Sequence, residues 1–278
     1  MSLDILISTF DSGIYKIKDI LLPPRLDVRY IVSHQYTNDN FKIIPEELKR
    51  NDVFIYHLSG KGLTISRNNA INFAEGNICL IADDDVKYNN QYLDSIINVF
   101  NDKTIDVACF KIKTPNGESE YKDYPEQRMK LITISIYSPS SIEIVFRTEE
   151  VKLKNIQFDS RFGLGSPLPG GEETLFIADC IRSGLNVFFV PIYVVEHPFE
   201  SSTKSLSKFD KRRNRVSGAI DYRLNGKISF LRSVIVSLKL IPELIKNKKN
   251  PFNYLLERIS GSLYILKTER ERKKQLNY

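Results

Sequence analysis

The chain has 278 residues, 42% hydrophobic and 27% charged, which suits one globular domain with an extension. Its three cysteines are too few for a disulfide framework, so we expect a reducing, cytoplasmic environment and no signal peptide. No apolar run approaches the roughly 20 residues that a membrane-spanning helix needs.

The net charge of +6 is unevenly distributed. Residues 204–278 contain 19 Lys or Arg and 6 Asp or Glu, a net of +13, whereas residues 1–203 contain 21 and 28, a net of −7. We therefore predict a main domain over 1–203 and a basic helical extension over 204–278. Such an extension is suited to an anionic partner, a lipid surface or nucleic acid, or is simply a solvated helical face.

Apolar runs predict strands alternating with helices along the first hundred residues. This alternation is typical of an α/β fold with a mostly parallel sheet. Strands are expected at Leu3–Phe10, Val28–Ser33, Val53–Leu58 and Ile78–Ala82, and helices at Ile65–Glu75 and around Tyr92–Phe100.

The later elements have less regular connections. Strands are expected at Ile105–Phe110, Leu131–Ile136, Ile142–Arg147, Val187–Val190 and Tyr193–Glu196, with a sharply bent loop at Phe162–Gly171 and a helix at Glu172–Arg182. In the extension, Pro242 divides two helices. Their apolar stripes are Leu231, Val234, Leu238, Ile241 and Ile245, then Leu255, Ile259, Leu263 and Leu266.

Three consecutive carboxylates, Asp83, Asp84 and Asp85, follow the predicted strand Ile78–Ala82 directly. Like charges repel one another there unless a cation or hydroxyl groups hold them. Open α/β sheets bind ligands at the carboxyl ends of their strands. The pattern therefore predicts a divalent metal bridging to the phosphates of a nucleotide-activated substrate, with a plain surface turn as the alternative.

A second acidic pair, Glu172 and Glu173, follows Gly170 and Gly171 at the start of a predicted helix. Glutamates in a first turn complement the helix dipole, so simple capping is one interpretation. In the other interpretation the glycines let a substrate approach the backbone. Glu173 then takes the proton of an attacking sugar hydroxyl, and Glu172 orients the acceptor.

Three further residues are candidates for ligand contacts. His197 follows a predicted strand, where it can be a metal ligand or a phosphate donor, although a solitary histidine is more often structural. Arg67 and Asn68, upstream of the three aspartates, are candidates to hold phosphate and ribose; a helix-surface charge is the alternative for Arg67.

Taken together, these segments resemble the inverting glycosyltransferases of family 2, which have the GT-A fold. The resemblance covers most of residues 1–200. It rests on Leu3–Phe10, Gly62-x4-Arg67-Asn68-Asn69-Ala70-Ile71, Asn77–Val86, Gly171-Glu172-Glu173-Thr174, Gly184, Pro191 and Val195-Glu196-His197.

The resemblance implies transfer of a sugar from a nucleoside-diphosphate sugar, in particular a UDP-sugar, to an acceptor hydroxyl with inversion, using Mn²⁺ or Mg²⁺. It implies that Asp83 and Asp85 bind the metal, with His197 near it, and that Glu173 is the catalytic base. The implied nucleotide-sugar contacts are Ser8, Thr9, Phe10, Arg67, Asn68, Asp83 and Asp84.

Two positions depart from the family pattern. Ser33-His34-Gln35-Tyr36 stands where an acidic pair normally reads the base, and the position of the catalytic base holds Glu rather than Asp. The chain also has no Trp, so it lacks the Gln-x-x-Arg-Trp motif of the processive synthases. A non-processive transferase is therefore expected.

Bacterial relatives commonly build surface polysaccharides on saccharide or lipid-linked acceptors. Residues 205–278 are accordingly expected to dock on the inner face of the plasma membrane, to pack on the main domain or to form a homodimer contact. Three alternatives are weaker. A sugar-phosphate nucleotidyltransferase would need a glycine-rich basic first loop, and a phosphatase would need Asp-x-Asp-x-Thr. A nucleic-acid binder is disfavoured by the acidic remainder of the chain.

Overall fold

The computed structural model describes residues 1–134, 137–199 and 207–275. It divides into two compact units. The first unit contains residues 1–160 and 176–199, and the second contains residues 161–175 together with the described residues from 207 to 275. The predicted boundary between residues 203 and 204 lies outside the described residues.

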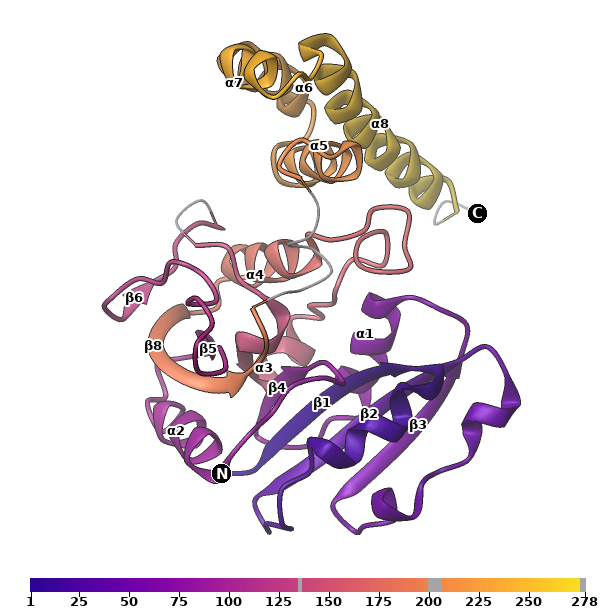
Figure 1. Cartoon of the computed structure of the whole chain (residues 1–278), viewed down its shortest axis with the longest axis vertical. Helices are drawn as coiled ribbons and strands as arrows, with labels where there is room; N and C mark the ends of the chain where they lie inside the picture. Colours follow the sequence, from indigo (N-terminus) through magenta and orange to yellow (C-terminus); the bar gives the residue numbers. More distant parts are fainter. Residues whose placement is uncertain (135–136, 200–206, 276–278) are drawn as a thin grey trace. The chain divides into compact units, whose positions relative to one another are not determined.

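A mixed sheet of eight strands forms the first unit, in the order β3-β2-β1-β4-β7-β5-β8-β6 (Figure 1). Four neighbouring pairs are parallel (β1–β2, β2–β3, β1–β4, β5–β8), and three are antiparallel (β4–β7, β5–β7, β6–β8). The mostly parallel α/β sheet is therefore confirmed. The strands are β1 Leu3–Phe10, β2 Val28–Tyr36, β3 Val53–Ser59, β4 Ile78–Ala82, β5 Val107–Lys113, β6 Met129–Lys130, β7 Ile144–Arg147 and β8 Val187–Glu196.

Helices cover both faces of this sheet. The 3-10 helix η1 (Asp11–Asp19) and α2 (Asn90–Val99) contribute to the core on one face. On the other face lie α1 (Leu63–Phe73), α3 (Thr148–Leu153) and α4 (Glu172–Arg182). Among the described connections, short 3-10 helices are formed by η2 Asp39–Lys42, η3 Glu46–Leu48 and η5 Ser141–Glu143.

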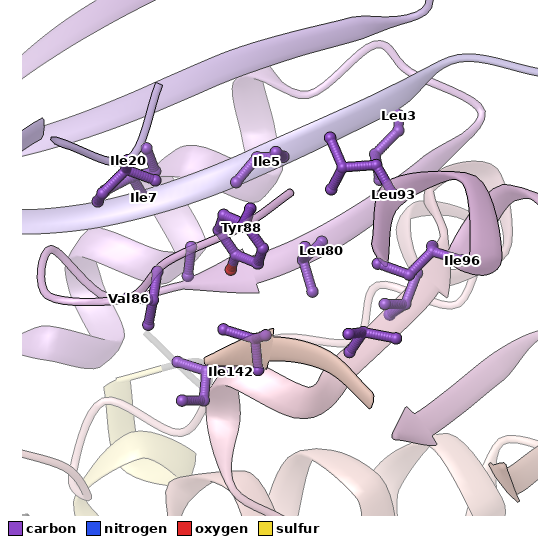
Figure 2. Packing of buried hydrophobic residues seen from close by; sticks show 14 of the residues in the cluster. Leu3, Ile5, Ile7, Ile20, Leu80, Val86, Tyr88, Leu93, Ile96 and Ile142 are labelled. Atoms are coloured by element: carbon purple, nitrogen blue, oxygen red, sulfur yellow. The ribbon is translucent and has the colours of Figure 1, made fainter. Parts of the chain in front are cut away.

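Side-chain alternation along β1 supplies both cores. Leu3, Ile5 and Ile7 pack toward η1 and α2, whereas Leu6 belongs to the core on the α1 side. Figure 2 shows Leu3 beside Leu93 of α2, Ile5 further along the strand, and Ile7 beside Ile20. Because β1 is buried on both faces, it is a near-continuous hydrophobic run and a rigid support for the residues at its end.

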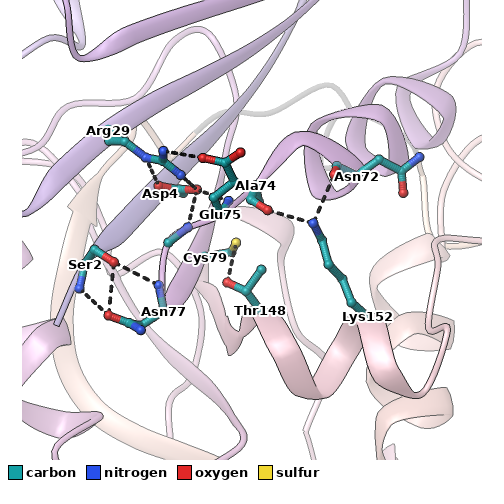
Figure 3. A network of polar contacts seen from close by, with 11 residues as sticks. Ser2, Asp4, Arg29, Asn72, Ala74, Glu75, Asn77, Cys79, Thr148 and Lys152 are labelled. Carbon is teal, nitrogen blue, oxygen red and sulfur yellow. Dashed lines mark hydrogen bonds and ion pairs between the residues drawn. The ribbon is translucent and has the colours of Figure 1, made fainter.

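A polar network closes the opposite, amino end of the same strands (Figure 3). Asp4 of β1 is fully buried and accepts hydrogen bonds from Arg29 and from the backbone N–H groups of Glu75 and Gly76. A Cβ at Gly76 would lie 2.7 Å from Asp4 Oδ1, which explains the glycine. The network fastens the end of α1 to β1 and β2, and so fixes where β4 begins.

Two strand predictions need correction. Residues 131–134 are not a strand, and residues 135–136 of that predicted strand lie outside the described residues. The neighbouring Met129–Lys130 forms β6 instead, while Leu131 is buried by packing. Residues 187–196 form one strand rather than two, because register shifts in the β5–β8 pairing accommodate Pro191.

The second unit contains four helices in its described part. They are α5 Lys211–Asn225, α6 Ile228–Lys239, α7 Ile241–Lys246 and α8 Pro251–Gln275. Gly218 of α5 and Gly261 of α8 face each other's helix so closely that a Cβ on either would overlap the opposing backbone. No helix within the described ranges is long and apolar enough to cross a membrane.

The predicted division of two helices at Pro242 is confirmed, since α6 ends at Lys239 and α7 begins at Ile241. The apolar stripe predicted on α8 lies beside the buried side of the helix and does not form it. The buried side consists of Tyr254, Arg258, Gly261, Ser262 and Ile265, and its small residues Gly261 and Ser262 lie at the close crossing with α5.

Candidate active site

The three aspartates lie at the carboxyl end of β4, beside the end of β1. The two strands are parallel, with Ile7 of β1 opposite Ala82 of β4. Because side chains alternate along an extended chain, consecutive aspartates can point to opposite sides of the sheet. Asp83 meets α1 on one side, and Asp84 meets Thr9 of β1 and the start of η1 on the other.

Asp84 is held by a hydroxyl. Thr9 Oγ1 donates to Asp84 Oδ2 at 2.5 Å. Burial raises the pKa of Asp84, and the Thr9 hydrogen bond opposes that rise. Gly13 of η1 packs directly against this pair, and a Cβ there would overlap both Asp84 Oδ2 and Thr9 Oγ1. A glycine is therefore required at position 13, because Asp84 and Thr9 approach its Cα closely. From the sequence, Gly13 was predicted only to belong to a turn.

Asp83 is held by a buried arginine. Arg67 of α1 is 1% exposed, and its Nη2 lies 3.0 Å from Asp83 Oδ1. The guanidinium also lies over the ring of Phe158, 5.5 Å from its centroid. Arg67 is thus a buried partner of Asp83 and not a helix-surface charge, and its predicted role in nucleotide binding stays a prediction. The Asp83 side chain remains about one third exposed, at 35%, and can meet a ligand as well.

Asn68 positions the segment beneath Arg67. Its Nδ2 donates to the carbonyl of Phe158, and its Oδ1 accepts from the N–H of Phe158, both at 2.8 Å. These two bonds set the Phe158 ring against the guanidinium of Arg67. The structure therefore gives Asn68 a supporting contact, and its predicted role in nucleotide binding stays a prediction.

Asp85 lies close to His197, which follows β8, three strands away from β4 in the sheet. The segment after the aspartates pairs antiparallel with the end of β8, where Lys87 and Glu196 exchange backbone hydrogen bonds. This pairing leaves Asp85 Oδ1 at 3.5 Å from His197 Nε2. The His197 interaction lowers the pKa of Asp85, and the same interaction raises the pKa of His197.

The second ring nitrogen of His197 defines its tautomer. Nδ1 lies 2.7 Å from the carbonyl oxygen of Pro198, which can only accept, so Nδ1 carries a proton. Nε2 then faces Asp85 and is the nitrogen left for a ligand when the ring is neutral. Tyr121 packs edge-on against the ring, with centroids 5.8 Å apart.

Asp85 and His197 fit a divalent cation. A carboxylate oxygen and an imidazole nitrogen 3.5 Å apart are close enough for one ion with bonds of about 2.1 Å to contact both. Within the described residues, no group of three or more His, Cys, Asp or Glu side chains is arranged to hold a metal. Two protein ligands suit Mg²⁺ or Mn²⁺, which take further ligands from substrate phosphates and water.

Glu172 and Glu173 begin α4, and residues 161–175 belong to the second unit. Glu172 is 3% exposed, whereas Glu173 is partly exposed. The preceding Gly171 has a φ of +86°, and a Cβ there would lie 2.5 Å from Ile220 of α5. The glycine thus lets this turn pack on α5 within the second unit.

The carboxyl ends of β1, β2 and β3 add residues with weaker sequence signals. Phe10 ends β1, and the Lys61 amine lies 5.5 Å from its ring centroid. Asp11 accepts hydrogen bonds from the Thr37 N–H and hydroxyl.

Ser8 is buried at the end of β1. Because side chains alternate along a strand, it points to the same face of the sheet as Asp83. The positive charge of Lys16 in η1 opposes the rise that burial causes in the pKa of Asp84, and after His197 it contributes to the lowered pKa of Asp85. Nothing in the sequence context of Lys16 marked it.

His34 and His57 form a neutral pair on neighbouring strands. His34 Nε2 donates to the carbonyl of Asp11 at 2.9 Å, so its Nδ1 accepts from His57 Nδ1 at 3.1 Å. Burial lowers the pKa of both rings. His34 stands in the segment where the family pattern has acidic residues, and its bond to Asp11 ties the end of β2 to the start of η1.

The neutral pair predicts a pH dependence of stability. Because the folded pKa of His34 is depressed, its contribution is complete above the unfolded value of about 6.5 and is lost as pH falls through the folded pKa. His197 has the opposite sign, since its raised pKa contributes stability below about pH 6.5 that is lost as pH rises.

Comparing wild type with His34→Gln isolates the first effect, because a Gln amide can still donate to Asp11. We expect the wild type to lose unfolding free energy relative to the variant between pH 7.5 and 5.5, by at most about 1.4 kcal/mol per pH unit. Urea titrations at both pH values measure this. Parallel pH profiles for the two proteins would contradict the assignment.

The family model described as glycosyl transferase family 2 matches residues 9–162, more than half of the chain. The chain belongs to glycosyltransferase family 2. The match includes Thr9, Arg67 and the three aspartates but ends before Glu172 and His197. A comparison with curated proteins finds no matching relative.

Solved structures share the fold. A crystal structure of S. aureus TarS 1–349 superposes with a TM-score of 0.61 at 19% identity, over 94% of this chain and 81% of that one. TarS 1–349 in complex with UDP-GlcNAc gives 0.62 at 19% identity, over 94% and 82%. The complex with UDP gives 0.59 at 18% identity, over 100% and 93%. These likenesses show the GT-A fold, as family 2 membership leads one to expect.

Proposed function

We propose that this family 2 glycosyltransferase moves a sugar from a UDP-sugar to an acceptor hydroxyl with inversion at the anomeric carbon. The observation that carries the proposal is that β1, β4 and β8 bring Thr9, Asp83, Asp84, Asp85 and His197 to one place. The TarS structures of similar fold contain UDP-GlcNAc and UDP, which supports a uridine nucleotide as donor.

Asp85 and His197 would hold Mn²⁺ or Mg²⁺, whose charge would neutralise the departing diphosphate. The remaining residues act on the nucleotide through contacts of their own. Arg67 keeps the Asp83 carboxylate oriented at the strand end, where it can accept hydrogen bonds from ribose hydroxyls. Thr9 fixes Asp84, and Phe10 offers a ring at the end of β1.

The acceptor must lose a proton as its oxygen attacks the anomeric carbon. We assign this proton to Glu173, whose partial exposure suits contact with an acceptor, while the buried Glu172 would orient that acceptor. The acceptor we propose is a saccharide or a lipid-linked glycan in bacterial surface polysaccharide synthesis, and the transfer is non-processive. We propose that the protein acts in the cytoplasm or on the inner face of the plasma membrane.

Thermal-shift measurements with a panel of nucleotide sugars test the donor assignment. We expect UDP and one or more UDP-sugars to raise the melting temperature when Mn²⁺ is present, because a ligand that binds only the folded state stabilises it. EDTA should remove most of this shift. Failure of every uridine nucleotide to stabilise the protein with Mn²⁺ would contradict the proposal. Product stereochemistry, read from the anomeric proton coupling by NMR, tests inversion separately.

Gly13→Ala tests the Thr9–Asp84 contact within this site. The added methyl would displace the Asp84 carboxylate and the Thr9 hydroxyl, which breaks a charge-assisted hydrogen bond. We expect UDP affinity to fall by roughly 10-fold or more, the equivalent of about 1.5–3 kcal/mol. Isothermal titration with Mn²⁺ measures the loss. Ser12→Ala, at the exposed neighbouring position, is the control and should bind as wild type does.

A further inference from the structure

Helix α6 of the second unit buries polar side chains and exposes aliphatic ones, the opposite of a typical surface helix. Its buried side consists of serines at every fourth position, Ser229, Ser233 and Ser237. Its outward side is aliphatic, and Ile228, Leu231 and Leu238 are 65%, 63% and 60% exposed. Helices on globular proteins normally direct such an apolar face toward the core. The outward aliphatic residues of α6 are Ile228, Leu231, Val234, Ile235 and Leu238, here called the α6 face.

Close packing explains why the serines lie inside. α6 packs against both α5 and α8, and those two helices already approach through Gly218 and Gly261. Small side chains permit such approaches, and the buried Ser237 hydroxyl donates to the carbonyl of Ser233 at 2.7 Å. Small residues inside with aliphatic residues outside is the arrangement that helices adopt when their surroundings are lipid.

The apolar surface continues into α7 and α8. Leu244 of α7 and Tyr254 of α8 share a small core with Val236 of α6, so the three helices form one corner of the unit. Figure 1 shows α6 and α7 beside the start of α8. Ile245 and Phe252, which flank the α7–α8 turn, are 63% and 64% exposed.

Exposed basic residues flank these helices along the chain. Residues 227–256 contain six Lys or Arg and one acidic residue, Glu243. Glu243 is already paired with Lys208 at 2.7 Å, so it does not offset the charge elsewhere. The exposed amines of this segment belong to Lys227, Lys239, Lys246, Lys248 and Lys249.

We propose that the α6 face, with Ile245 and Phe252, inserts into the surface of an anionic lipid bilayer. The aliphatic side chains would enter the acyl boundary while the surrounding lysines meet lipid phosphates. α6 has 12 residues and is therefore about 18 Å long, which suits a helix lying in the interface. A second copy of the chain is a poorer occupant, because two rims of the same positive charge would face each other.

Vesicle sedimentation with the full chain tests this surface. The vesicles contain phosphatidylcholine alone or with about one third phosphatidylglycerol, an anionic lipid. We expect binding to the anionic vesicles only, reduced at least about 10-fold in the double variant Leu231→Gln/Leu238→Gln, because each exposed leucine loses its burial in lipid. Leu153→Gln is the matched control: that leucine is 74% exposed on α3 of the first unit, and binding should not change.

A second pair of variants separates the local rim from overall charge. Lys246→Gln/Lys248→Gln/Lys249→Gln should weaken binding more than Arg272→Gln/Lys273→Gln/Lys274→Gln at the other end of α8. Melting curves confirm that each variant is folded.

Vesicle binding by Leu231→Gln/Leu238→Gln equal to that of wild type would overturn the proposal, as would equal losses in the two triple variants. So would concentration-dependent association that the leucine variants abolish without any vesicle binding, since that result assigns the α6 face to a second copy. None of these readouts depends on donor turnover.

Discussion

Asp85→Asn is expected to lower kcat/KM for donor turnover by about 100- to 1000-fold. The change keeps the shape of the side chain but removes the negative charge that faces His197 at 3.5 Å. In our proposal Asp85 holds the cation whose positive charge stabilises the leaving diphosphate. Such a cation typically contributes several kcal/mol to a transfer reaction, so weaker cation binding should appear mainly in kcat. The Mn²⁺ concentration for half-maximal turnover should rise together with the loss of rate.

The control for this variant is Asp94→Asn, an exposed aspartate on α2 that pairs with Arg25. It removes the same charge from the same unit and should leave turnover unchanged. His197→Gln should resemble Asp85→Asn, because it removes the other member of the pair. Wild-type turnover and an unchanged Mn²⁺ requirement in both site variants would exclude this pair as the cation ligands.

Glu173→Gln is expected to abolish transfer while leaving nucleotide binding intact. A positioned general base contributes typically 100- to 10,000-fold, and the amide cannot accept the acceptor proton. Nucleotide affinity should be retained, since Thr9, the aspartates and His197 are untouched. Single-turnover transfer to a saccharide acceptor and titration with UDP measure the two properties separately.

Two further variants of this pair decide between the glutamates. Glu173→Asp should restore part of the activity, because a carboxylate returns with a side chain one methylene shorter. Glu172→Gln should raise KM for the acceptor more than it lowers kcat if Glu172 only orients that substrate. Full transfer by Glu173→Gln together with its loss in Glu172→Gln would move the base to Glu172.

The fold could be predicted well wherever local pattern and tertiary packing agree. Leu3–Phe10, Ile78–Ala82 and Glu172–Arg182 have the bounds expected of them, because each is an apolar run or stripe with polar or glycine limits. The strand prediction at residues 131–134 was wrong because Leu131 is buried by packing, which does not require a strand partner. Pro191 led us to predict a break between two strands, but β8 is continuous. The register shifts that accommodate the proline depend on the pairing with β5 and leave no signal in the local sequence.

The site was partly visible in the sequence. The three aspartates could be placed from the end of a predicted strand, since open α/β sheets bind ligands at the carboxyl ends of their strands, whereas Thr9 came from the resemblance to the family. Their individual partners could not, because the contacts of Asp84 with Thr9 and Gly13 depend on how η1 folds over β1. The outward face of α6 was equally hidden. Its periodicity marks an apolar stripe but not which side of the helix packs inward.

The pairing of Lys87 with Glu196 also has a consequence for biosynthesis. Asp85 and His197 are 112 residues apart, and this pairing brings them together. A polypeptide still leaving the ribosome can form the Thr9–Asp84 contact early, but it cannot join Asp85 to His197 until β8 has been translated and has entered the sheet. The Asp85–His197 pair, to which we assign the cation in our proposal, should therefore form late during synthesis, as one of the last steps in folding of the first unit.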